Sequence, residues 1–269
     1  MVRIVSRQLG LTGGKLVLLL AVVACCGPVC LAGTGGPEPI LLELFTSQGC
    51  SSCPPADAWV QRLDSTQPMA GAEFIVLSEH VDYWNHDGWK DPYSSAQLTE
   101  RQEEYASQFG LGEVYTPQII LDGDTVLKLS DQSQMIASLK KAAVAPMLPV
   151  SIQSATLTAG GPGVLTGTIV ADGSGQRHGG EVYVAVALNS TQTDILAGEN
   201  DGKKLTNVAV VKDLVKIGKM DKGKDFQQAF RVKLWSGADP SNLRLVAFVQ
   251  ESGEGKVLGA AMTRTILKK

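Results

Sequence analysis

The chain has few cysteines, and most of them stand near its beginning. Of the five cysteines among 269 residues, Cys25, Cys26 and Cys30 precede residue 33. Only Cys50 and Cys53 are left for the rest of the chain. This excludes a structural framework of several disulfides and a zinc site made of two cysteine pairs.

Clusters of positive charge are also missing. The formal net charge is −3, and no segment gathers Lys and Arg residues together. Binding to nucleic acid depends on many contacts between such residues and phosphates. A nucleic-acid partner is therefore excluded, and the sequence contains neither an internal repeat nor a low-complexity tract.

No apolar run is long enough to cross a bilayer. The uncharged apolar run at residues 16–26 has about half of the roughly 20 residues that a membrane-spanning helix needs. It follows the basic residues Arg3, Arg7 and Lys15, and a Gly-Pro pair ends it. This arrangement is typical of a signal peptide.

The signal peptide can end in two ways. Cleavage after Ala32 would give residues 1–32 as the signal peptide and residues 33–39 as a Gly/Pro-rich spacer. Lipid attachment at Cys25 would instead anchor the chain to a membrane. Both routes predict a periplasmic or secreted protein, whose only link to a membrane is that lipid anchor.

Residues 40–146 read as an α/β domain with a single mixed sheet. Short apolar runs bounded by turn residues predict strands, and longer segments with one apolar face predict helices. The predicted order is strand, helix, strand, helix, strand, strand and helix. The elements are residues 40–45, 54–64, 74–77, 95–109, 118–121, 125–129 and 133–145.

The pattern of apolar and polar residues changes after the Pro-rich boundary at residues 146–149. Residues 150–267 contain segments that alternate apolar with polar residues and are separated by Gly-rich turns, which predicts a domain resembling a β-sandwich. Its predicted strands are residues 164–170, 181–188, 226–234, 243–250 and 256–266.

The sequence Cys50-Ser51-Ser52-Cys53 lies between a buried strand and the start of a helix. Unpaired N–H groups and the dipole at a helix N-terminus stabilise a thiolate, which is the reactive form of cysteine. We expect Cys50 to be exposed and nucleophilic, and Cys53 to be shielded and to resolve mixed disulfides. The motif thus predicts thiol–disulfide chemistry without a cofactor.

Two alternatives remain for the cysteine pair. One is an inert structural disulfide. The other is a copper or zinc carrier in which His80 joins Cys50 and Cys53 as a ligand.

Thr116-Pro117 opens the third predicted strand. A trans proline is awkward there unless it lies at a sheet edge, and an ordinary turn proline is one interpretation. With the cysteine motif upstream, the segment resembles the proline loop that faces the cysteines in thioredoxin-like folds, and we expect a cis peptide bond. Thr116 would then offer backbone groups to an extended client chain, with Pro117 shaping the groove.

Glu43 lies on the strand that leads to the cysteines. Burial of a carboxylate is costly, so a buried Glu43 needs a role such as proton exchange with Cys53. The alternative is a Glu43 that faces solvent at a sheet edge.

Aromatic and polar residues gather after the second predicted strand. Residues 79–84, together with Trp89 and Asp91, combine acids, His80 and the rings of Trp84 and Trp89. They are predicted to line a substrate groove, to tune the thiolate or to bind metal. The plainer interpretation is an aromatic cluster with satisfied polar groups.

Several motifs resemble a bacterial secreted family called domain of unknown function 1223. The opening motif spans residues 43–57, and later blocks lie at residues 80–84, 88–89, 91–92, 101–102, 114–118, 198–200 and 210–211. The resemblance implies a thioredoxin-like domain followed by a β-rich domain. It implies no particular substrate.

Together these features predict a thiol–disulfide oxidoreductase of the cell envelope. Its catalytic residues would be Cys50, Cys53, Pro117 and Glu43, and its substrate-binding residues Thr116, Trp84 and Trp89. Its partner would be an envelope protein that carries thiols or disulfides. A binding module that keeps the same fold is the alternative.

Overall fold

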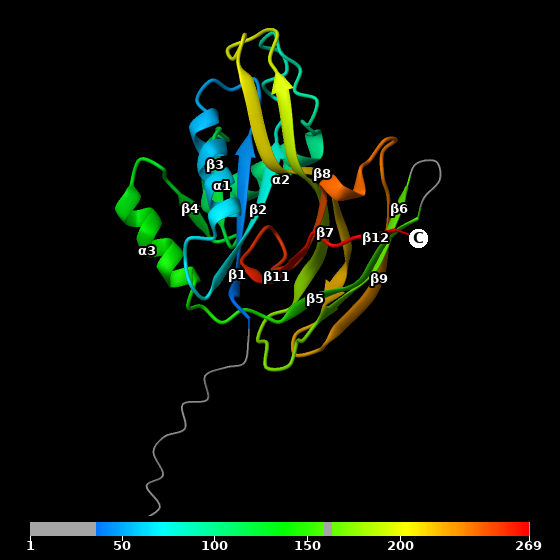
Figure 1. Cartoon of the computed structure of the whole chain (residues 1–269). Coiled ribbons are helices and arrows are strands. Elements are labelled where there is room, and N and C mark those ends of the chain that lie inside the picture. Colours follow the sequence, from blue (N-terminus) through cyan, green and yellow to red (C-terminus); the bar gives the residue numbers. More distant parts are fainter. Residues whose placement is uncertain (1–35, 159–162, 269) are drawn as a thin grey trace, which may run out of the picture. The chain divides into compact units, whose positions relative to one another are not determined.

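A computed structural model describes residues 36–158 and 163–268 of the chain. Both expected ends of the signal peptide, at Cys25 and after Ala32, lie outside the described residues, as does the beginning of the spacer. The described chain is a mixed α/β fold with one large mixed sheet and a second, small sheet (Figure 1).

The large sheet has eight strands in the order β11-β10-β7-β8-β2-β1-β3-β4. β1 lies parallel to β2 on one side and antiparallel to β3 on the other. The strands of the large sheet are β1 (Glu38–Thr46), β2 (Ala72–His80), β3 (Gln118–Leu121), β4 (Thr125–Leu127), β7 (Gly180–Asp194), β8 (Lys204–Met220), β10 (Leu243–Gln250) and β11 (Val257–Thr263).

The ends of the three helices α1, α2 and α3 lie at residues that favour helix termini. α1 (Pro54–Thr66) begins with two prolines, which are tolerated in a first turn. α2 (Ala96–Phe109) has Ser95 as its N-cap and ends at Gly110, whose φ of 64° suits glycine. α3 (Gln132–Ala142) has Asp131 as its N-cap.

The alternation of side chains along β1 sends neighbouring residues to opposite faces of the sheet. Leu42 and Leu44 pack in a core that includes residues of α1 and α3. Leu41 packs with Leu98 of α2, and Phe45 packs with Tyr105 of the same helix. α1 and α3 therefore cover one face of the sheet, and α2 covers the other.

The same sheet continues into the second half of the chain. β2 pairs in parallel with β8 at Ser78 and Val210, and β8 then pairs with the whole length of β7. Val208 and Ala209 of β8 contribute to the core beneath α1. The two segments that the sequence presents as successive domains thus share one sheet.

The small sheet has the order β12-β5-β6-β9. It stacks on the outer part of the large sheet, because Ile169 and Phe230 of the small sheet pack with Val184 and Leu245 of β7 and β10. Its strands are β5 (Val150–Thr158), β6 (Val164–Ala171), β9 (Phe226–Lys233) and β12 (Leu267–Lys268), and a short 3-10 helix, η1 (Pro240–Asn242), precedes β10.

Across residues 36–158 and 163–268, none of the helices combines the length and the apolar character needed to cross a membrane.

Candidate functional site

The two cysteines of the motif form a disulfide bond between β1 and α1. Their Cα atoms lie 5.5 Å apart. The N–H of Cys53 donates to the carbonyl of Cys50 (3.3 Å), which closes the loop. Cys53 is also the N-cap residue of α1, so the positive end of the helix dipole lies next to this loop. The expected unpaired N–H groups are absent there, because the two prolines of the first turn have no N–H and the next two N–H groups donate to the carbonyl of Cys53. The dipole, and not a free N–H group, therefore favours a thiolate when the bond is reduced.

Both sulfur-bearing residues are buried, which corrects one expectation. Cys50 and Cys53 each have 0% exposure, while Ser51 and Ser52 between them are exposed. The expectation that Cys50 is exposed was wrong, because it considered only the residues around the motif. Residues from the second half of the chain reach over this loop.

The covering residues come from the connection between β7 and β8. Asn200 donates from Nδ2 to the carbonyl oxygens of Gln48 and Cys50, both at 2.9 Å. The Glu199 carboxylate accepts from the N–H of Ser51 at 3.0 Å. Asn200 is fully buried, so its two hydrogen bonds are shielded from water.

The loop before β3 lies beside the cysteine loop, as predicted. The Thr116–Pro117 peptide bond is cis. The carbonyl of Thr116 accepts from Ser52 Oγ (3.4 Å), and its hydroxyl accepts from Trp84 Nε1 (2.8 Å). Cys50 Sγ in turn lies 3.3 Å from Ser52 Oγ. The structure thus brings Cys50, Thr116 and Trp84 together.

Gln102 on α2 holds the two ends of this proline loop. Its Nε2 donates to the carbonyl of Tyr115 (2.7 Å) and to Oε1 of Gln118 (2.8 Å). Tyr83 donates to Oε1 of Gln102. Gln102 is fully buried and therefore fixes the loop on both sides of Pro117.

Trp84 and Trp89 occupy different positions. Trp84 packs closely on Gly49, where an added Cβ would lie only 3.1 Å from the Cβ of Trp84. Trp89 lies further from the disulfide and donates from Nε1 to Oε1 of Gln48 (3.3 Å). Both rings are half-buried, and each supports the cysteine loop through a neighbour of Cys50.

Glu43 is buried, but on the sheet face opposite α1. Its Oε1 accepts from Nε of Arg101 at 2.7 Å and forms an ion pair with Nη2 of the same residue at 2.6 Å. Its Oε2 accepts from the Tyr105 hydroxyl at 2.6 Å. Its exposure of 0% excludes a Glu43 that faces solvent. The structure does not bring Glu43 to Cys53, because both of its partners lie on α2.

Glu43 belongs to a charged cluster that ties the two halves of the chain together. Arg101 also donates to Gln250 (2.9 Å), the last residue of β10, and to Glu254 (2.6 Å), which follows β10. Burial raises the pKa of Glu254 to about 7 although the charge of Arg101 opposes the shift. Burial and the charge of Glu43 raise the pKa of Glu79 well above its usual value.

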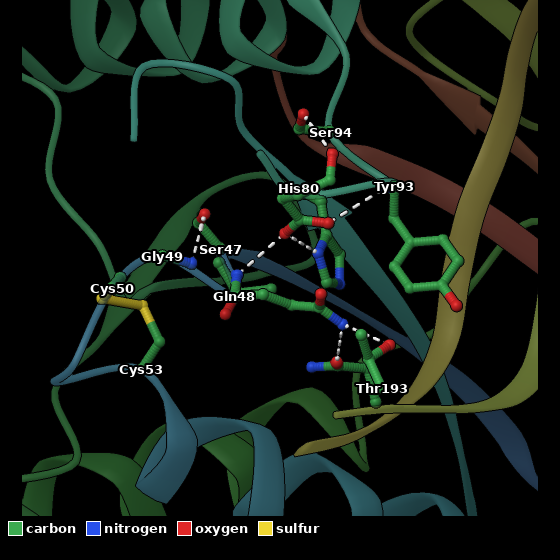
Figure 2. A network of polar contacts seen from close by, with 12 residues as sticks. Ser47, Gln48, Gly49, Cys50, Cys53, His80, Tyr93, Ser94 and Thr193 are labelled. Carbon is green, nitrogen blue, oxygen red and sulfur yellow. Dashed lines mark hydrogen bonds and ion pairs between the residues drawn. A yellow bond between two sulfur atoms is a disulfide. The ribbon is translucent and has the colours of Figure 1, made fainter. Parts of the chain in front are cut away.

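A second polar network lies behind the cysteine loop, on the α1 side of the sheet. Gln48 and His80 of this network lie near the disulfide (Figure 2). Asp91 Oδ2 accepts from the N–H of Gln48 (2.8 Å) and contacts His80 Nδ1 (2.7 Å). Burial alone would lower the pKa of His80 and raise that of Asp91. The charge of each on the other, with their hydrogen bond, outweighs burial, so the pKa of His80 is raised and that of Asp91 is lowered.

Asp57 is the buried carboxyl on the same side as the cysteines. It lies one helical turn after Cys53, and residues at this spacing share a face of a helix. Thr46 donates to its Oδ1 (3.0 Å). Burial raises the pKa of Asp57 to about 6, partly opposed by the charge of His80 and the hydrogen bond from Thr46. Asp57 also lines an open pocket between α1 and the beginning of β8.

The imidazole of His80 does not join the cysteines in a ligand set. Its Nδ1 is taken by Asp91, and its buried Nε2 has no hydrogen-bond partner among the described residues. Within that part of the chain, no three His, Cys, Asp or Glu side chains converge in a way that would hold a metal ion. His80 pairs instead with the carboxylate of Asp91.

Three residues of the site were missed by the sequence analysis. Asp57 carried a usable signal, because it follows Cys53 by four residues within a predicted helix. The only signal for Glu199 and Asn200 was the family resemblance, because their contacts with the cysteine loop span about 150 residues of sequence. No local pattern indicates such a contact.

The solved structures that resemble this chain include one of similar fold over most of its length. It is protein AGR_C_4864 from Agrobacterium tumefaciens, which is 27% identical, covers 85% of this chain and 95% of its own, and has a TM-score of 0.64. No curated protein matches the chain.

Two further solved structures are much less similar. Spo0M, a sporulation control protein from Bacillus subtilis, is 15% identical over 46% of this chain and 50% of its own, with a TM-score of 0.30. A β-glucosidase from Listeria innocua is 13% identical over 45% of this chain and 16% of its own, with a TM-score of 0.24.

A family model described as "Protein of unknown function (DUF1223)" matches residues 41–250. The match includes both cysteines, the Thr116–Pro117 loop and the β7–β8 connection, so it covers the whole candidate site. The chain therefore belongs to the DUF1223 family, as the resemblance of its motifs predicts.

Proposed function

We propose that this protein is a thiol–disulfide oxidoreductase whose reactive group is the Cys50–Cys53 pair. The observation that carries the proposal is the disulfide at the N-terminus of α1, beside a proline loop that contacts Ser52. A pair of cysteines in this position lies at the positive end of the helix dipole, which favours the thiolate form of a reduced thiol. It also has a neighbouring loop against which a client chain can lie.

The element order supports a thioredoxin-like assignment for the first half of the chain. The order β1-α1-β2-α2-β3-β4-α3 agrees with the order that the sequence predicts for such a domain. The cysteines follow the central strand β1, and the loop of Pro117 precedes the antiparallel strand β3 beside it. This brings two loops from distant parts of the sequence to one end of the sheet.

The proposed reaction transfers two electrons between a client dithiol and the cysteine pair. A client thiolate attacks Cys50 Sγ, the bond between Cys50 and Cys53 breaks, and Cys53 leaves as a thiolate that takes up a proton. The second client thiol loses its proton, attacks the client sulfur of the mixed disulfide and releases Cys50. The client becomes a disulfide and the pair becomes two thiols; the reverse sequence oxidises the pair.

We assign the proton exchange with Cys53 to Asp57 in place of Glu43. Asp57 lies on the helix face of Cys53, and its pKa of about 6 suits a group that both gives and takes protons near neutral pH. The pocket that it lines with Pro54 and Lys204 offers a route for protons to solvent. Glu43, bound by Arg101 and Tyr105, is a structural residue of the cluster that joins the two halves.

The client in this proposal is a thiol- or disulfide-bearing protein of the cell envelope. A shallow groove runs past Pro117 between Tyr115 and Leu129, and Tyr115 exposes 44% of its surface there. An extended client segment in this groove would lie next to Ser52 and Thr116. The predicted signal peptide supports a periplasmic or secreted location, with a lipid at Cys25 as the alternative to release.

A redox titration against glutathione tests the proposal. We expect reversible reduction of the pair in the folded protein, with a definite potential. In the variant Cys53→Ser, glutathione should accumulate as a mixed disulfide on Cys50, because the resolving thiol is missing. The matched variant Cys50→Ser should form little of this adduct. A disulfide that is reduced only when the protein unfolds would contradict the proposal.

A metal carrier that uses Cys50, Cys53 and His80 is the alternative that the sequence leaves open. The pairing of His80 with Asp91 gives it no support. We expect the reduced protein to lose added copper or zinc on dialysis. Stoichiometric metal that survives dialysis, and is lost in His80→Ala, would favour the carrier.

A further inference from the structure

The connection between β7 and β8, residues 195–203, is called here the hairpin tip. It forms the end of the long β7–β8 hairpin, which reaches the cysteine loop from the second half of the chain (Figure 1). Gly198 in this tip has a φ of 76°, and an added Cβ would lie 2.9 Å from the carbonyl oxygen of Asp87. The tip is therefore packed closely against the loop that follows β2.

Two side chains of the hairpin tip bind the backbone of the cysteine loop. Asn200 holds the carbonyl groups of Gln48 and Cys50, and Lys203 donates to Oδ1 of Asn200 (2.9 Å). Glu199 holds the N–H of Ser51, the residue directly after Cys50. Every polar atom of the Asn200 side chain therefore has a partner, although the side chain is fully buried.

We propose that Asn200 and Glu199 are positioning residues that control the reactivity of Cys50. Asn200 keeps the cysteine loop closed, and the tip must move away before a client sulfur reaches Cys50. Glu199 occupies the N–H of Ser51 and places a negative charge near Cys50. This inference rests on the proposed function, since it concerns the same disulfide.

The chemistry of each contact gives it a distinct effect. An amide N–H bonded to a carboxylate is not free to stabilise a thiolate on Cys50, and the carboxylate charge repels one. The hydrogen bond with Ser51 lowers the pKa of Glu199, so the carboxylate keeps its charge at neutral pH. Loss of Asn200 removes two hydrogen bonds that are present only while the tip is closed.

Other charged groups near the loop are left unchanged in the test. Asp91 binds the N–H of Gln48, Asp57 lies on α1, His80 pairs with Asp91, and Lys203 lies on the tip itself. A difference between the parent and a Glu199 variant can therefore be ascribed to Glu199.

The first experiment measures how fast dithiothreitol reduces the disulfide of the folded protein at pH 7. We expect Asn200→Ala to be reduced roughly tenfold faster than the parent, because two hydrogen bonds no longer oppose opening. Asn200→Asp, which presents a carboxylate to two carbonyl oxygens, should also be faster. Leu196→Ala is the matched control, since Leu196 lies on the same tip and is 77% exposed.

The second experiment measures the pH profile of alkylation at Cys50 in a Cys53→Ser background. Glu199→Gln keeps an acceptor for Ser51 but removes the charge. We expect its profile to move to lower pH and the rate below the midpoint to rise roughly threefold, the size of a surface charge effect at a helix terminus. A purely structural role of Glu199 would leave this profile where it is.

The outcomes separate this inference from the proposed function. Equal reduction rates in the parent, both Asn200 variants and Leu196→Ala would overturn the role of Asn200 while the oxidoreductase proposal stood. An unchanged profile in Glu199→Gln would overturn the role of Glu199. If Asn200→Ala does not fold, as judged by near-UV circular dichroism, Asn200→Asp decides. A parent disulfide that resists reduction altogether would instead reject the proposed function.

Discussion

Two buried carboxyl groups at this site lie on opposite faces of the sheet and have different partners. Glu43 and Asp57 are both buried carboxyl groups near the cysteines in sequence. Glu43 has a cation and a hydroxyl as partners, whereas Asp57 has hydroxyl and amide partners and the more distant His80. Asp57 has a raised pKa and lies on the face that carries Cys53.

The variant Asp57→Asn tests the cost of this buried carboxyl. The folded protein holds the proton of Asp57 more tightly than the unfolded chain, so stability falls as the pH rises from about 4 to about 6 and stays lower above that. We expect Asp57→Asn to be more stable than the parent at pH 7.5 by roughly 1–3 kcal/mol, with little difference at pH 4. Urea unfolding at the two pH values measures this.

Glu103→Gln is the control for this comparison, because Glu103 is an exposed carboxyl on α2. Its free energy of unfolding should change by less than about 0.5 kcal/mol at either pH. An Asp57→Asn protein that is less stable than the parent at pH 7.5 would show that the hydrogen bonds of the carboxylate outweigh its burial.

Much of the site could be predicted from residues close together in the sequence. The Cys-Ser-Ser-Cys motif between an apolar strand and a proline-headed helix identified the disulfide loop, and a proline at the start of a strand predicted the cis bond. The burial of Cys50 could not be predicted, because Asn200 covers it from a distant hairpin. The side to which Glu43 points depends on strand register, which the sequence of one strand does not give.

Helices and strands are joined across the molecule by a few buried ion pairs. Asp64 in the last part of α1 accepts from Nη1 and Nη2 of Arg244 on β10, at 2.6 and 2.9 Å. Arg264 also reaches Asp64 (2.9 Å), but from the surface. The two arginines thus share one partner and differ mainly in burial, at 2% and 44% side-chain exposure.

Replacing each arginine in turn compares a buried with an exposed ion pair. Arg244→Met should lower the free energy of unfolding by roughly 3 kcal/mol, since it leaves Asp64 largely buried with a weaker partner. Arg264→Met should cost less than about 1 kcal/mol. Chemical denaturation at neutral pH measures both. Equal losses in the two variants would mean that burial does not determine the strength of this pair.

Elements with regular patterns were predicted well, and irregular strands were missed. β3 and β10 have the predicted bounds, and α2 differs by a single residue. β8 was not recognised although it is 17 residues long, and β5 was also missed. Both contain a residue with positive φ, Ala209 at 52° and Ser154 at 55°, and register shifts in their pairing. Such irregularities break the alternation on which strand prediction depends.

Taken as a whole, the chain buries charges whose partners come from both halves. Arg101 of α2 is 4% exposed and depends on Glu254 and Gln250 for two of its contacts. A fragment that ends near residue 146 would leave this guanidinium with fewer partners and would expose the edge of β2 that pairs with β8. The first half therefore depends on the second for its stability.

Unfolding experiments on the full chain and on residues 36–146 test this dependence. We expect the full chain to unfold in one transition, with the same midpoint by far-UV circular dichroism and by tryptophan fluorescence. The fragment should lack a cooperative transition. Two separate transitions in the full chain, or a fragment as stable as the intact protein, would show that the halves fold independently.

The shared sheet could not be predicted from the sequence. A Pro-rich stretch at residues 146–149 and a change from helices to alternating strands are typical of a boundary between domains. The pairing of Ser78 with Val210 joins the segments on either side of that stretch, and no residue near it indicates the contact. The β-rich composition of the second half was nevertheless predicted from alternation alone.

The contact between Asn200 and the cysteine loop affects when, during synthesis and folding, the disulfide forms most easily. Asn200 follows Cys50 by 150 residues, so a ribosome makes the cysteines long before it makes the residue that shields them. An oxidant that meets the unfinished chain finds both thiols uncovered. Once the long hairpin has docked, the same reagent has to wait for the tip to open. The bond is therefore easiest to form before folding is complete and hardest to reach afterwards.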